Sequence, residues 1–111
     1  MANSITAWNK QAVEITAIDS DWQFSDTFPF DMGVLLIQFV PGADTDRCVI
    51  KAGDAAGPIV FDVSVAATTD HRVQYFYGEQ LNLFLDVSEG SYNANAKVII
   101  VATDRRLGPR H

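Results

Sequence analysis

The sequence predicts an all-β protein, an antiparallel β-sandwich of about eight short strands, and three observations predict it. Short runs rich in Val, Ile, Phe and Tyr recur along the 111 residues. Turn-forming stretches such as PGADTD, GDAAGP and SEGSYNAN separate them. Several runs alternate apolar and polar residues, as strands do when one face is buried and the other is wet. We therefore expect two packed sheets and almost no helix.

The expected strands follow the apolar runs in chain order. In the run 59–65, Ile59, Phe61 and Val63 share one face, and in 81–87 the leucines at alternate positions do the same. The run 34–40 (VLLIQFV) is apolar on both faces apart from Gln38, which predicts a central strand or one that a partner covers. The eight predicted strands are 5–8, 13–18, 34–40, 48–52, 59–65, 72–77, 81–87 and 97–103.

Two sandwich topologies fit this pattern, a jelly roll, which we favour, and an immunoglobulin-like fold. The segment YGEQ after residue 76 resembles a two-residue hairpin turn with Gly78 at positive φ. That hairpin would set the polar face of 72–77 against the apolar face of 81–87. A bulge, or strands lying in different sheets, would resolve the conflict. We expect Tyr75 to face the same side as Leu83, and separate sheets favour the jelly roll.

The segment 21–33 has no sustained strand pattern although it is rich in aromatic residues. A loop of this length usually either covers part of the fold or serves a function. One interpretation is a loop folded onto an open end of the sandwich. The other is an interface, because aromatic side chains anchor protein contacts. The candidate interface residues are Trp22, Phe24, Phe28 and Phe30.

No constellation in the sequence supports catalysis, a metal site or a cofactor. His71 lies next to Asp70, but neighbouring strand residues point to opposite faces, so neither orients the other easily. The chain lacks GxSxG and the glycine-rich nucleotide motifs. Two Asp-x-Asp turns, which begin at Asp19 and Asp44, lack the rest of a calcium loop. Cys48 is alone and lies in an apolar run, which predicts a buried structural thiol.

Charge and length limit the function classes further. The net charge of −6 argues against a nucleic-acid partner, which requires clusters of Lys and Arg. No apolar run is long enough to cross a bilayer, and the N-terminus does not resemble a signal peptide. We expect one domain over residues 1–104, followed by a basic tail over 105–111.

The stretches GPIVFDVSV, RVQYFYG and LNLFLDVSEG resemble the small β-sandwich virion proteins of tailed bacteriophages. The resemblance covers residues 34–103. It lies in the general character of a short, acidic, almost entirely β chain and includes no diagnostic motif. It implies a non-enzymatic structural role, as a capsid decoration (cement) protein or another small head, neck or tail component. It further implies a homo-oligomer, with a trimer favoured, that binds the major capsid protein or another virion protein after assembly in the host cytoplasm.

A carbohydrate-binding module is the alternative function, because sandwich folds bind sugars through exposed aromatic rings together with Asp and Asn. The candidate sugar-binding residues are Trp22, Tyr75, Tyr77, Asn82 and Asp86. This interpretation requires Trp22 and the two tyrosines to lie exposed along one groove.

Overall fold

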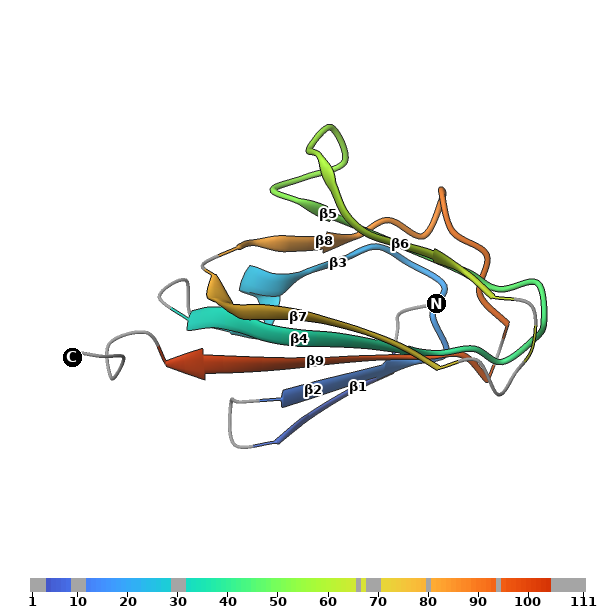
Figure 1. Ribbon diagram of the computed structural model, residues 1–111, viewed down its shortest axis with the longest axis horizontal. Helices are drawn as coiled ribbons and strands as arrows, with labels where there is room; N and C mark the ends of the chain where they lie inside the picture. The colour runs from blue at the N-terminus through green and yellow to red at the C-terminus, as the bar shows by residue number, and fades with distance from the viewer. Residues whose placement is uncertain are drawn as a thin grey trace.

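The computed structural model describes residues 4–8, 12–28, 32–65, 67, 71–79, 81–93 and 95–104. These residues form two antiparallel sheets that lie face to face (Figure 1). The five-stranded sheet has the order β1-β2-β9-β4-β7, and the four-stranded sheet has the order β3-β8-β5-β6. The strands are β1 (Ser4–Trp8), β2 (Ala12–Thr16), β3 (Trp22–Gln23), β4 (Met32–Val40), β5 (Arg47–Ala52), β6 (Ile59–Ser64), β7 (Arg72–Glu79), β8 (Leu83–Leu85) and β9 (Lys97–Asp104).

The strand pairing is that of a jelly roll. The chain from β2 to β9 behaves as one long hairpin whose turn lies between β5 and β6, so β2 pairs with β9, β3 with β8, β4 with β7 and β5 with β6. The hairpin is rolled up so that β4 also pairs with β9 and β5 with β8. This nested order confirms the all-β sandwich and separates it from the immunoglobulin-like alternative. β1 extends the larger sheet beside β2.

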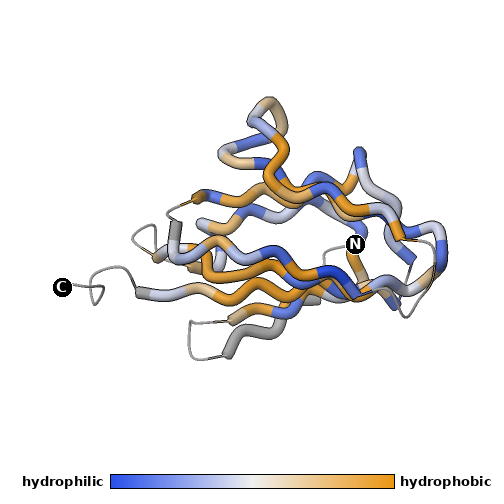
Figure 2. The backbone as a smooth tube through the Cα atoms, in the orientation of Figure 1, coloured by the Kyte–Doolittle hydropathy of each residue, from blue (hydrophilic) through white to orange (hydrophobic). Residues whose placement is uncertain are grey.

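The core lies between the sheets and is built from the alternating residues that the sequence places on one face of each strand. The fully buried side chains include Ile15, Ile37, Phe39, Ile50 and Ile100. Phe39 packs edge-on against Tyr92, with 6.1 Å between the ring centroids. Apolar residues follow β4 and β9 along their length in Figure 2. This alternation explains why the strands are visible in the sequence.

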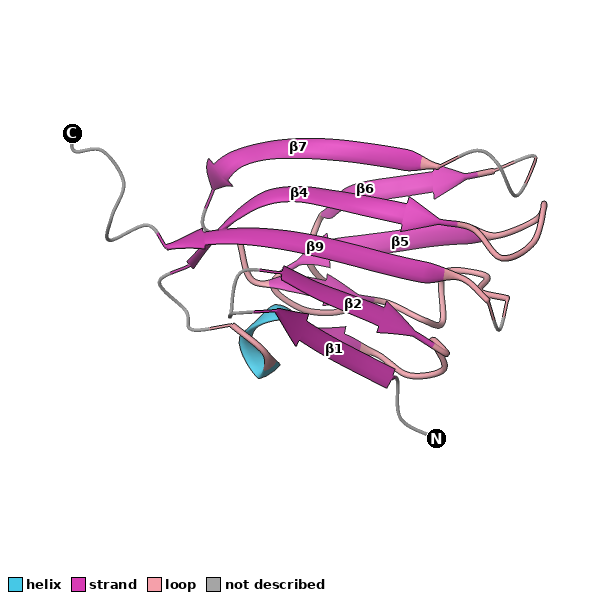
Figure 3. Ribbon diagram, turned by 90° about the horizontal axis from the view of Figure 1, so that it is seen from below, coloured by secondary structure: helices cyan, strands magenta, loops and turns pink. Residues whose placement is uncertain are grey.

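The segment after β2 holds structure that the strand pattern did not predict. Trp22 and Gln23 form the short strand β3, and Phe24–Asp26 form a 3-10 helical turn, drawn in cyan in Figure 3. The amide of Gln23 donates to the carbonyl of Gly53 at 2.8 Å, which ties the segment to the loop after β5. Two residues are too few for period-2 alternation to be recognised.

The strands β7 and β8 lie in different sheets, as one resolution of the register conflict required. Gly78 has a φ of +84°, which confirms the prediction of positive φ. The expected orientation of Tyr75 is wrong, because Tyr75 is 59% exposed whereas Leu83 is fully buried. Tyr75 pairs with Leu36 on the outer face of the larger sheet, and Phe76 takes the inward position. A phenylalanine has no polar group that loses its hydration on burial, whereas the outward tyrosine keeps its hydroxyl in water.

A buried carboxylate joins two loops at one end of the sandwich. Asp46 is 2% exposed and accepts hydrogen bonds from the backbone N–H groups of Gly42, Ala43 and Asn93. Three backbone donors compensate for the loss of water around the charge. Of the two carboxylates in the Asp-x-Asp turn that begins at Asp44, Asp44 is therefore exposed, whereas Asp46 is buried as an acceptor of backbone hydrogen bonds.

Candidate functional site

Three of the four aromatic residues proposed for an interface lie in the core of this chain. Trp22, Phe24 and Phe28 are 3%, 2% and 2% exposed, and Phe30 lies outside the described residues. The rings of Phe24 and Phe28 are 4.6 Å apart, and the indole N–H of Trp22 donates to the hydroxyl of Thr27. Side chains that are buried within their own chain offer no surface to a partner. These three rings therefore fit the interpretation of a segment that covers part of the fold.

The residues proposed for sugar binding do not come together. Tyr75 and Tyr77 are exposed on β7 of the five-stranded sheet. Trp22 is buried in the other sheet, and the side chain of Asn82 accepts a hydrogen bond from the backbone N–H of Ser25. Asp86 is 3% exposed and bonded to Lys51. The exposed aromatic groove that this hypothesis required is therefore not formed by this set.

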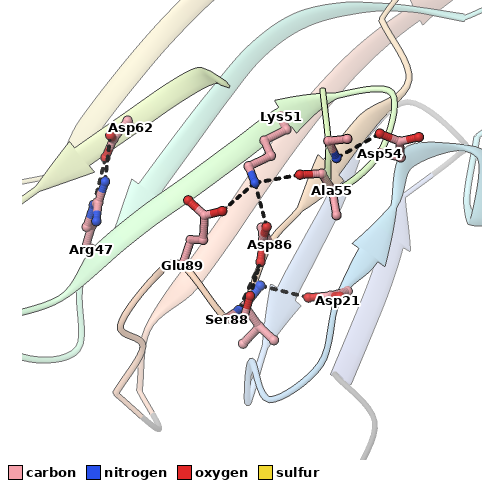
Figure 4. A network of polar contacts seen from close by, with 11 residues as sticks. Asp21, Arg47, Lys51, Asp54, Ala55, Asp62, Asp86, Ser88 and Glu89 are labelled. Carbon is pink, nitrogen blue, oxygen red and sulfur yellow. Dashed lines mark hydrogen bonds and ion pairs between the residues drawn. The ribbon is translucent and has the colours of Figure 1, made fainter. Parts of the chain in front are cut away.

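The outer face of the four-stranded sheet is covered by polar contacts within the chain (Figure 4). The guanidinium of Arg47 on β5 donates two hydrogen bonds to the carboxylate of Asp62 on β6, at 3.0 and 2.9 Å. This contact lowers the pKa of Asp62 below its ordinary value, chiefly through the hydrogen bond. Ion pairs within the chain thus lie on this face.

A buried ammonium group forms the centre of that covering. Lys51 is 5% exposed, and its Nζ donates to Asp86 at 2.9 Å, to Glu89 at 2.6 Å and to the carbonyl of Ala55 at 2.8 Å. Hydrogen bonds to Glu89 and Asp86 raise the pKa of Lys51. Hydrogen bonds from Lys51 and then Ser88 lower the pKa of Asp86. All three ammonium protons have hydrogen-bond acceptors, so the Lys51 side chain links β5 to the loop after β8 as a structural contact.

The outer face of the five-stranded sheet has a different character. Tyr75 on β7, Leu36 on β4 and Val101 on β9 stand opposite one another in neighbouring strands, and so share one face. Val73 pairs in the same way with Gln38 and is 44% exposed. We call the following set the outer apolar patch: Leu36, Val73, Tyr75 and Val101, which the strand pairs place on this face, with the exposed residues Leu35 and Tyr77 at bulges in the same strands.

A β-bulge in β4 enlarges the patch. Between Val34 and Leu36 the strand advances two residues while β9 advances one, from Ala102 to Val101. Leu35 and Leu36 therefore both stand opposite Val101, and Leu35 is 37% exposed. The double-sided apolar pattern of VLLIQFV was the sequence signal for this surface. Nothing in the sequence pattern predicted the bulge that places the two leucines side by side.

Tyr77 is the most exposed large apolar side chain among the described residues, at 89%. Tyr75 pairs with Leu36, and the next pair joins Glu79 to Val34. Between these pairs β7 advances four residues and β4 only two, so β7 bulges over residues 76–78. Tyr77 has a φ of +56°, in the left-handed region. This conformation costs a side chain with a Cβ about 1–2 kcal/mol. At this exposure the ring makes little contact within the chain that could offset the cost.

The remaining candidates for chemistry form no site. His71 is exposed just before β7, and Asp70 lies outside the described residues. Within the described part of the chain, no group of three His, Cys, Asp or Glu side chains is placed to hold a metal ion. Nor does that part of the chain contain a helix long and apolar enough to cross a bilayer.

Comparison with known proteins gives no relative from which a role could be transferred. No family model matches the chain, and no match was found among curated proteins or among solved structures.

Proposed function

We propose that the chain is a non-enzymatic structural subunit of a virus particle, a capsid decoration protein of a tailed bacteriophage that oligomerises and binds the capsid surface. The observation that carries the proposal is the outer apolar patch on a jelly roll whose other outer face is covered by its own ion pairs. Exposed apolar patches of this kind on soluble proteins mark binding surfaces. Jelly rolls recur in viral capsids, which is a fold-level analogy.

The charge of the chain is consistent with this role. A net charge of −6 favours the solubility of the subunits before they dock on the capsid. The resemblance in residues 34–103 favours a trimer, and a position on the capsid places the protein in the mature virion. A small neck or tail component is the closest variant of the proposal, because it uses the same kind of docking surface.

The experiment is to purify particles of the phage that encodes the chain and to identify their proteins by mass spectrometry. We expect this chain in stoichiometric amounts, released by mild denaturant before the capsid protein unfolds. In parallel, purified chain is mixed with particles that lack it and sedimented. Absence from the particles, together with no co-sedimentation, would overturn the proposal.

The carbohydrate-binding alternative retains one observation in its favour, the exposed rings of Tyr75 and Tyr77. Aromatic faces on a flat sheet can stack against sugar rings. A glycan array separates the two functions: binding that is lost in both Tyr75→Ala and Tyr77→Ala supports the sugar hypothesis, and a blank array removes it.

A further inference from the structure

We propose that the outer apolar patch binds a second copy of this chain, with Tyr77 as the anchor of the contact. The inference deepens the proposed function, on which it rests for assigning the patch to assembly. Three independent properties of the patch support a second copy as its occupant: its charge, its area and the backbone conformation of Tyr77.

The first argument is the distribution of charge. Each chain has a net charge of −6, so two copies repel unless the surfaces that meet are uncharged. The strand pairs across β7, β4 and β9 place Val73, Gln38 and Ile99 in one row, with the next row formed by patch residues. Along these three strands no member of the two rows is charged, and the first row continues on β2 to Glu14. Glu14 forms an ion pair with Lys97, with 3.6 Å between the two charged groups.

The opposite sheet does not offer an equivalent surface. Its outer face carries the ion pairs of Arg47 and Lys51, and its exposed large apolar residue is Ile59 on β6. An acidic or basic partner would be recognised through charges. A neutral apolar patch on an otherwise acidic protein is instead complementary to the same patch on another copy.

The second argument is the area available. The strands of this sheet have five to nine residues, and at about 4.8 Å between strands and about 3.3 Å per residue the whole face measures roughly 550 Å². Two such faces together bury roughly 1,100 Å², which is at the small end of specific protein interfaces. Because β7 is the outermost strand of its sheet, the patch can lie close to either a two-fold or a three-fold axis. The expected contact is reversible and depends on concentration.

The third argument is the conformation of Tyr77. Its positive φ is unfavourable for a tyrosine, and 89% of its surface remains exposed. The neighbouring Tyr75 is outward-facing as well, but it is not among the residues with positive φ. Tyrosines are enriched among the residues that dominate binding energies, and bulges re-aim side chains toward such sites. The bulge therefore holds Tyr77 ready for a neighbouring subunit.

The test is sedimentation velocity and light scattering of the full chain over a concentration series. We expect the wild type to associate, to a mass of two or three chains. Tyr77→Asn and Tyr75→Asp should each raise the dissociation constant by at least about tenfold. The control is Ile59→Asp, which adds the same charge at an exposed apolar position on the other sheet and should associate like the wild type.

A second readout separates the role of Tyr77 from a structural one. Asn tolerates the left-handed region, so Tyr77→Asn should raise the denaturant midpoint while association is lost. Tyr75→Asn, at ordinary strand geometry, should weaken association without raising the midpoint. A chain that becomes more stable and less able to associate cannot have lost association through misfolding.

Two outcomes overturn the inference: a wild type that stays monomeric at its highest soluble concentration, or patch variants that associate as tightly as the wild type. A monomer that still co-sediments with phage particles would refute the inference and leave the proposed function standing. A chain that associates through the patch but is missing from the particles would refute the proposed function and leave the contact between copies standing.

Discussion

At the scale of single residues, the decisive choice is which aromatic side chain of RVQYFYG points inward. Phe76 enters the core, whereas Tyr75 and Tyr77 stay outside. Alternation predicts two opposite faces but does not say which is buried, because both faces of this segment carry aromatic rings. The pairing of Tyr75 with Leu36 and of Gln74 with Ile37 settles it.

Cys48 provides a prediction at this scale. Its side chain is fully buried, and burial raises the pKa of the thiol to about 12. The thiolate is the reactive form, so we expect alkylation of the native protein to be slower by orders of magnitude than alkylation in denaturant. The rate with iodoacetamide, followed by mass spectrometry, measures this. Fast labelling of the native chain would contradict the burial of Cys48.

Asp86 provides a second prediction, for the dependence of stability on pH. Its pKa is lowered in the folded state by hydrogen bonds from Lys51 and Ser88. The stabilisation is therefore present above the unfolded pKa of about 3.9 and is lost as pH falls through the lower folded value. Asp86→Asn should melt below the wild type at neutral pH, and the two melting temperatures should converge as pH falls below about 4.

The control for this titration is Asp44→Asn, at an exposed carboxylate in the loop after β4. At neutral pH its melting temperature should match that of the wild type, whereas Asp86→Asn should melt lower. A constant difference between Asp86→Asn and the wild type down to acid pH would show that the carboxylate is not ionised and paired with Lys51.

At the scale of elements, the aromatic segment after β2 is the clearest case of tertiary context deciding a role. Trp22 stands opposite Leu85 in β3, and the 3-10 turn brings Phe28 next to Phe24. The same composition would suit an exposed interface loop. Only the position of β8 and the core behind it shows that these rings are covered.

Phe28→Ala tests this role. Because the ring is 2% exposed, its removal should lower the free energy of unfolding by about 3–5 kcal/mol. Tyr75→Ala, at a ring 59% exposed, should cost less than about 1 kcal/mol. Urea titrations followed by tryptophan fluorescence measure both. Similar costs for the two variants would mean that Phe28 is not part of the core.

At the scale of the whole molecule, the nested hairpin makes most strand pairings distant in sequence, whereas β1 pairs with β2 and β5 with β6 next to it in the chain. Ala12 pairs with Val101, and Trp22 of β3 pairs with Leu85 of β8. Such pairings require the chain to lose the entropy of closing a long loop before the stabilising contacts form. We expect refolding in milliseconds to seconds, measured by stopped-flow fluorescence. Refolding in microseconds would be inconsistent with this topology.

The sequence by itself determined the fold class and the approximate position of eight strands, because alternation and turn residues act over short distances. It also indicated that β4 is apolar on both faces. The tertiary structure decided the rest: the burial of Trp22, the inward turn of Phe76, the covering of one outer sheet by Lys51 and its partners, and the exposure of Tyr77. These depend on which strands become neighbours, and that is set by contacts between residues far apart in the chain.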